Sequence, residues 1–231
     1  MRRKALKPIA HFSPMPYLAF FFLVLPLLFA GCFGGKNGEK QRPIQKWSCD
    51  PQADRAMREK DYLNSILFHQ RLLEKEPQNA LALYHLGYSY GQKGDHEIEV
   101  LYYERAKAAG YIEGSFYFNM GMAYGEIGKE REAITCFKKA ISLNPNLPDN
   151  YLGLGLAYSR TPGGDELAEE AFLKAISMDP GFLYARLCLG RFYAGRKKVG
   201  EAKEQLYKIL EIDPENSDAR DLLKELKDYR K

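Results

Sequence analysis

Small, apolar and proline residues recur along most of this 231-residue chain at a spacing close to 34. Pro145, Pro180 and Pro214 are 35 and 34 residues apart. Single small residues keep the same spacing, and these are Ala53, Gly87, Gly121, Gly155 and Gly190. A period of this length predicts repeated helix-turn-helix units stacked into a solenoid, because no unit can bury its apolar face alone.

The residues within each unit resemble the tetratricopeptide repeat (TPR) family. In that pattern an aromatic residue, Leu-Gly and Tyr are followed by Ala, Phe and a helix-ending Pro. The third unit matches it best, with Tyr117, Met120, Gly121, Tyr124, Ala133, Phe137, Ala140 and Pro145. The resemblance implies an all-α, right-handed superhelix of about five helix-turn-helix repeats. The predicted repeats are residues 46–79, 80–113, 114–147, 148–182 and 183–216. The recurring glycine is expected to let the two helices of a repeat approach closely.

A capping helix is predicted for residues 217–231, after the last repeat. One apolar stripe at helical spacing is formed by Ala219, Leu222, Leu223 and Leu226. Charged residues occupy the opposite face, as the end of a solenoid requires, and Ser217 is the predicted N-cap.

The N-terminus has the pattern of a secretion signal. Basic residues between Arg2 and Lys7 precede an apolar run from Tyr17 to Ala30. This run of about 14 residues is shorter than the roughly 20 that span a bilayer, so residues 1–31 are predicted to be a signal peptide. The alternative is an uncleaved signal anchor.

The sequence Leu28-Phe29-Ala30-Gly31-Cys32 resembles the lipobox of bacterial lipoproteins, although Phe29 stands where an aliphatic residue is usual. The resemblance implies that Cys32 carries the lipid and that residues 32–45 form a flexible, glycine-rich tether. The expected location is the bacterial cell envelope, with the protein facing the periplasm. Phe33 follows the cysteine in place of the aspartate of many inner-membrane lipoproteins, which favours the outer membrane.

Composition and charge exclude several classes of protein. Hydrophobic content of 45% and charged content of 28% are typical of a globular chain, not of a disordered or polytopic membrane protein. Four of the 34 basic residues lie in the first 31 positions, which leaves 34 − 4 = 30 against 30 acidic residues in the rest. Nucleic-acid binding is not expected, because the body of the protein has no excess of basic residues.

Apparent catalytic motifs coincide with the repeat. Gly87 to Gly91 spells the G-x-S-x-G motif of hydrolases, but Ser89 stands where other repeats place Ala123 and Ala157. We therefore predict that the chain is not an enzyme, and an envelope hydrolase using Ser89 is a distant alternative.

Histidines and cysteines are expected to be structural, with no metal and no cofactor. His69 occupies the position of Phe137 in the third repeat, and His85 and His96 have no partner at metal-ligand spacing. Free thiols are expected at Cys136 and Cys188, and no spacing favours a disulfide with Cys49.

The TPR resemblance implies that the first helix of each repeat lines an inner, concave face that binds protein partners. The predicted groove residues are Tyr84, Tyr88, Phe118, Asn119, Met122, Leu152, Leu156, Arg160, Tyr184, Leu187 and Arg191. These side chains predict an apolar or amphipathic partner segment, although much of the strip could instead be packing between helices. Chaperone-binding TPR proteins hold a partner's carboxylate with a set of asparagine and basic residues, and Asn119 is the one residue of this sequence that matches that set.

The sequence thus predicts a membrane-anchored, non-enzymatic adaptor for protein–protein interaction. The main specific alternative is a pilotin-like lipoprotein that helps a type IV pilus secretin to assemble, since such proteins also carry TPR arrays behind a lipobox.

Overall fold

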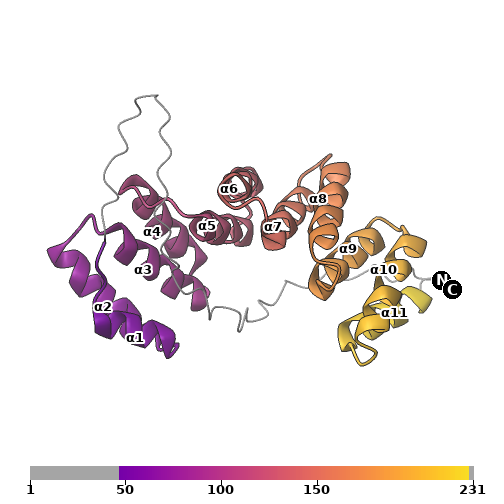
Figure 1. Ribbon diagram of the computed structural model, residues 1–231, viewed down its shortest axis with the longest axis horizontal. Helices are drawn as coiled ribbons and strands as arrows, with labels where there is room; N and C mark the ends of the chain where they lie inside the picture. Colours follow the sequence, from indigo (N-terminus) through magenta and orange to yellow (C-terminus); the bar gives the residue numbers. More distant parts are fainter. Residues whose placement is uncertain (1–46, 229–231) are drawn as a thin grey trace, which may run out of the picture. The chain divides into compact units, whose positions relative to one another are not determined.

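The computed structural model describes residues 47–228, which contain eleven helices and no strand. Figure 1 shows them in order from indigo to yellow. The helices are α1 (Pro51–Arg58), α2 (Tyr62–Lys75), α3 (Ala80–Gln92), α4 (His96–Ala108), α5 (Gly114–Glu126), α6 (Glu130–Leu143), α7 (Pro148–Ser159), α8 (Asp165–Met178), α9 (Leu183–Gly195), α10 (Val199–Ile212) and α11 (Ser217–Asp228). The all-α prediction is confirmed. The predicted signal peptide, Cys32 and the tether lie outside the described residues.

Helices pack in sequence order, each against the next, from α1 to α11. Alternate helices also touch, because α3 contacts α5, α5 contacts α7, α7 contacts α9 and α9 contacts α11. This arrangement gives five helix pairs followed by α11, and it places the odd-numbered helices side by side. None of the helices in the described range is long and apolar enough to cross a bilayer.

Glycines in the first helix of a pair make room for rings from the second helix. A Cβ atom at Gly121 would lie 2.9 Å from Cε1 of the buried Phe137 ring. A Cβ atom at Gly87 would likewise lie 2.8 Å from Cδ1 of the Tyr103 ring. Because real Cβ atoms do not approach this closely, each glycine fixes the distance between its two helices.

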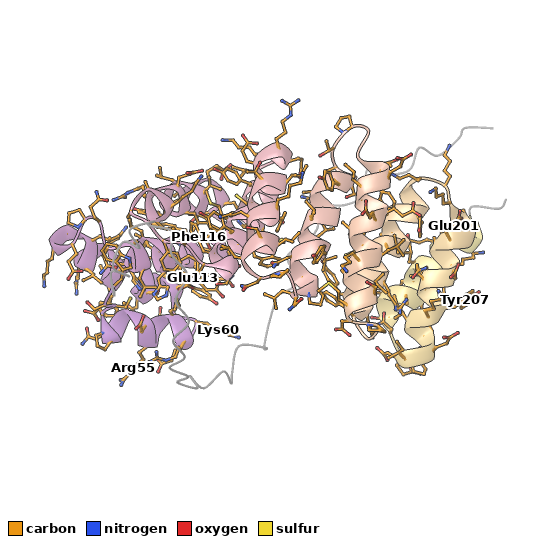
Figure 2. The ribbon with its side chains drawn as sticks, turned by 45° about the horizontal axis from the view of Figure 1, so that its top comes forward. Arg55, Lys60, Glu113, Phe116, Glu201 and Tyr207 are labelled. Atoms are coloured by element: carbon orange, nitrogen blue, oxygen red, sulfur yellow. The ribbon has the colours of Figure 1, made fainter. Side chains whose placement is uncertain are left out.

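The buried apolar residues form two clusters along the array, both of which include residues of α7 and α8. Phe116 on α5 is fully buried, whereas Tyr207 on α10 is 51% exposed and projects from the C-terminal end (Figure 2). Ring contacts join neighbouring repeats, since the centroid of Phe116 lies 5.7 Å from that of Tyr103 on α4.

The capping helix α11 begins as predicted, but its cap differs. Asn216, not Ser217, accepts a hydrogen bond from the Ala219 N–H at 3.1 Å. The reason is positional, because the capping side chain precedes the first helical residue and reaches an N–H inside the first turn. Ala219, Leu223 and Leu226 are buried under the last repeat.

Candidate functional site on the first helices

The predicted groove residues fall into three classes of exposure. Leu152 and Leu187, which are 1% and 7% exposed, belong to the core and are not accessible to a partner. Arg160 and Arg191 are exposed. The half-buried members are Tyr84, Tyr88, Phe118, Asn119, Met122, Leu156 and Tyr184. We call these seven residues the inner strip.

The N-terminal part of the inner strip also takes part in packing. Tyr84 stacks on Tyr111 with ring centroids 5.0 Å apart, and its hydroxyl accepts a hydrogen bond from Asn119 Nδ2 at 2.7 Å. Burial raises the pKa of Tyr84. The side-chain amide of Asn119 is thus bound within the chain, which does not favour a clamp for a partner's carboxylate.

The middle of the strip contains a small cavity between α5 and α7. Its lining includes the side chains of Met122, Phe137 and Leu156. Small residues open the space, and these are Gly121, Gly125, Gly153 and Ala157. The cavity measures only about 20 Å³, so it is a shallow apolar depression and not a pocket that encloses a ligand.

Three charged residues line this cavity, namely Glu126, Glu130 and Arg160, and two of them form an ion pair. Arg160 Nη1 donates to the backbone carbonyl of Gly125 at 3.1 Å and lies 3.8 Å from Glu130 Oε1. Burial raises the pKa of Glu130, while the nearby Arg160 guanidinium acts in the opposite direction. Further along, Arg191 Nη2 lies 3.4 Å from Asp218 Oδ1 on α11. Both arginines of the predicted groove are thus engaged by acidic residues of this chain.

Known proteins match this architecture in sequence and in structure. Two sequence profiles described as tetratricopeptide repeat match the chain, one over residues 52–111 and the other over residues 115–147. This chain is a TPR protein. The predicted family and superhelical fold are therefore confirmed.

Several solved structures resemble most of this TPR protein. The crystal structure of MamA is 28% identical, with a TM-score of 0.65 over 74% of this chain and 98% of MamA. YrrB, described as a TPR protein with an unusual peptide-binding site, is 23% identical, with a TM-score of 0.65 over 74% of this chain and 88% of YrrB. A thermophilic TPR protein from Thermus thermophilus is 22% identical, with a TM-score of 0.59 over 75% and 94% of the two chains.

The G-x-S-x-G motif of this TPR protein lies inside α3. Ser89 is fully buried, its hydroxyl donates to the His85 carbonyl at 2.9 Å, and it lies 2.8 Å from Ser65 Oγ on α2. A nucleophilic serine needs an exposed position on a strand-to-helix turn, so this geometry does not support the hydrolase alternative.

Sequence spacing missed one cluster of metal-ligating side chains. Cys49, Asp54, His69 and His85 lie together at the N-terminal end of the array. His69 is buried and hydrogen-bonded, as expected of a structural histidine, but the spacing along the sequence did not indicate that His69 and His85 lie beside Cys49 and Asp54. Burial lowers the pKa of both histidines, that of His85 to about 4, so both are neutral near pH 7.

That cluster has a weak trace in the sequence. His69 stands at the repeat position that holds Tyr103 and Phe137 in later repeats, and it is fully buried. A buried imidazole needs hydrogen-bond or metal partners that a phenyl ring does not need. The ligand spacings of 5, 15 and 16 residues follow the repeat geometry and match no familiar metal motif.

The other thiols behave as predicted for buried cysteines. Within the described residues Cys49, Cys136 and Cys188 are all free. Burial raises the pKa of Cys136 to about 11 and that of Cys188 to about 12, so both remain protonated.

Proposed function

We propose that this TPR protein is a lipid-anchored, non-enzymatic adaptor of the bacterial cell envelope, which binds an apolar or amphipathic segment of a protein partner. Protein–protein interaction is the function that its TPR repeats and its structural neighbours support. The peptide-binding site described for YrrB supports a peptide-like segment as the ligand here.

The observation that carries the proposal is the cavity between α5 and α7. Met122 and Leu156 offer apolar contacts at its wall, and the neighbouring Arg160 is engaged by Gly125 and Glu130. A partner that rests an apolar side chain against these walls therefore needs no acidic group to pair with Arg160.

Membrane attachment rests on the lipobox-like sequence that ends at Cys32. The proposed location is the periplasmic side of the outer membrane. Cys32→Ser is expected to leave the protein unprocessed or soluble, as membrane fractionation and labelling with a radioactive fatty acid can measure. A membrane-bound wild-type protein without acyl label would instead support an uncleaved signal anchor.

A narrower form of the proposal is a pilotin-like role, which the combination of a lipobox-like sequence and a TPR array favours. In that case loss of this protein should reduce secretin multimers in the outer membrane. Unchanged secretin assembly in a deletion strain would exclude this role and leave the general adaptor function intact.

Peptide display tests the groove directly. Peptides selected on the wild-type protein should be rich in apolar and aromatic residues, and salt should change their affinity little. Leu156→Glu is expected to reduce their binding at least tenfold, because it places a carboxylate in the apolar wall of the cavity, where an apolar side chain of the peptide cannot pair with it. The matched control is Leu173→Glu on α8, whose leucine is 44% exposed and which should bind as the wild type does. Selection of acidic peptides, or equal effects of the two variants, would contradict the proposal.

A further inference from the structure

Four potential ligands converge at the N-terminal end of the array from separate elements. Cys49 precedes α1, Asp54 is on α1, His69 is on α2 and His85 is on α3. Their donor atoms all lie within 4.8 Å of one another.

The distances between these atoms approach those of a tetrahedral metal centre. Cys49 Sγ lies 3.2 Å from His69 Nε2 and 3.3 Å from His85 Nδ1, and that same His85 Nδ1 lies 3.4 Å from Asp54 Oδ1. A zinc ion with bonds of about 2.0–2.3 Å separates its ligand atoms by about 3.3–3.6 Å. Small side-chain rotations would therefore place all four donors around one ion.

The orientation of His69 is already set for metal binding. Its Nδ1 lies 2.8 Å from the Ser65 backbone carbonyl, and since a carbonyl only accepts, Nδ1 carries the proton and donates. Nε2 then presents its lone pair toward Cys49. Imidazoles that ligate metals commonly hold their second nitrogen in this way.

Asp54 supplies an independent observation. Its Oδ1 atom is buried and has no hydrogen-bond partner among residues 47–228. His85 Nδ1 lies 3.4 Å from this oxygen without forming a hydrogen bond to it, and a cation held by the four side chains would give the buried oxygen a direct ligand bond.

A catalytic Cys-His-Asp arrangement does not fit the same residues. Relay of a proton requires the thiol and the carboxylate to face opposite nitrogens of the imidazole. Here both Cys49 and Asp54 face Nδ1 of His85. In addition, burial and the nearby Asp54 raise the pKa of the Cys49 thiol, whereas a nucleophile needs it lowered.

We propose that Cys49, Asp54, His69 and His85 form a binding site for a divalent transition-metal ion, with Zn²⁺ as the expected ion. The combination of one sulfur, two imidazoles and one carboxylate suits zinc. Bound there, the ion links the segment before α1 to the first three helices. It thereby fastens the N-terminal end of the described array.

Cobalt and zinc titrations of the purified full chain test this site. The chain carries Cys32→Ser, which prevents lipid modification and removes one other thiol. We expect one equivalent of Co²⁺ to bind with the visible bands of a tetrahedral ion and a sulfur-to-metal charge-transfer band. Zn²⁺ should displace it, and a competing chelating dye gives the zinc affinity.

Ligand variants then assign the site. Cys49→Ser should abolish the charge-transfer band and weaken zinc binding at least about 100-fold, and His85→Gln should weaken it comparably. His96→Gln and Cys136→Ser are the matched controls, with zinc affinity expected to equal that of the parent chain. Asp54→Asn, a nearly isosteric change, is expected to weaken zinc binding at least about tenfold. This variant tests the site if another ligand variant does not fold.

Two results would overturn the proposal. One is a parent chain that holds no stoichiometric ion at micromolar free zinc, which would mean that these residues form a hydrogen-bonded cluster only. The other is a folded Cys49→Ser or Asp54→Asn variant that binds zinc as tightly as the parent chain.

Discussion

The two ends of this TPR array use the same backbone register for different chemistry. Where a second helix packs on its own repeat's first helix, the later repeats place Tyr103, Phe137, Phe172 and Leu206. In the first repeat the equivalent residue is His69, which is equally buried but contacts sulfur, hydroxyl and carbonyl groups. The same difference separates Ser89 from its counterparts Ala123 and Ala157.

The contrast shows how a repeat protein can gain a local site without changing its fold. A ring that packs on a glycine needs no polar partner, and it stabilises the fold through the apolar area that it buries. An imidazole in that position needs polar partners, which accumulate around it at the N-terminal end. At the other end α11 covers the last repeat with Ala219, Leu223 and Leu226, so apolar contact suffices there.

Removing a ring should have the largest effect. Phe137→Ala is expected to lower the free energy of unfolding by about 3–5 kcal/mol, since this ring contacts glycines of both α5 and α7. Urea unfolding followed by circular dichroism measures the change. Leu173→Ala on the exposed side of α8 should change the same quantity by less than about 0.5 kcal/mol. Similar losses for the two variants would show that the ring–glycine contacts do not hold the array together.

Adding a single methyl group should act in opposite directions at two glycines. Gly121→Ala places a Cβ 2.9 Å from Phe137 and is expected to cost about 1–3 kcal/mol. At Gly200, where the Cβ meets nothing within 4 Å, alanine should stabilise the protein by about 0.4–1 kcal/mol. Thermal and urea unfolding of both variants would reveal the signs, and an equal sign would contradict the packing described here.

Two asparagine side chains cap helices near opposite ends of the array, so their replacement compares the stability of the two ends. Asn79 caps α3 through the Ala82 N–H and also donates to the Ser48 carbonyl at 2.8 Å, whereas Asn216 caps α11. Replacement by alanine should cost about 0.5–2 kcal/mol at either site, with the larger loss at Asn79.

The Asn79–Ser48 bond also positions the neighbouring Cys49. Asn79→Ala should therefore weaken zinc binding, while Asn216→Ala should leave it unchanged, as the chelating-dye competition can show. If both asparagine variants bound zinc equally, Asn79 would have no role in holding the proposed site.

The smallest expected effect concerns pH and a histidine outside the cluster. His96 Nδ1 lies 2.8 Å from Glu99 Oε2, and this hydrogen bond raises the pKa of His96 above 6.5. A raised pKa stabilises the fold fully below about pH 6.5, and this contribution is lost as pH rises through the folded-state value. The stability difference between wild type and His96→Gln should thus be larger near pH 6 than near pH 8.5, as urea unfolding at each pH can measure. If the stability difference between wild type and His96→Gln increased with pH, the His96–Glu99 hydrogen bond would not raise the pKa of His96.

Most of the fold was predictable because one period carries the information about packing. The recurring small residues at 87, 121, 155 and 190 mark the places where a second-helix side chain packs on the first helix of its repeat. Exposure within the inner strip was less predictable, since Leu152 and Leu187 share helix faces with accessible residues and yet are buried by neighbouring repeats. Only the imidazole of His69 at a ring position hinted at the N-terminal cluster in the sequence, because its four members become neighbours only when three helices and the preceding segment pack.

Hydrogen–deuterium exchange of the full chain, with and without zinc, tests most directly whether the two ends are held by different chemistry. In a solenoid each repeat contacts only its neighbours, so local stabilisation remains local. We predict that zinc slows amide exchange in α1, α2 and α3 and leaves α9, α10 and α11 unchanged, and that Cys49→Ser removes this difference. Equal slowing of exchange at both ends, or no slowing in α1 to α3, would contradict the account that polar ligands hold the N-terminal end and apolar packing holds the C-terminal end.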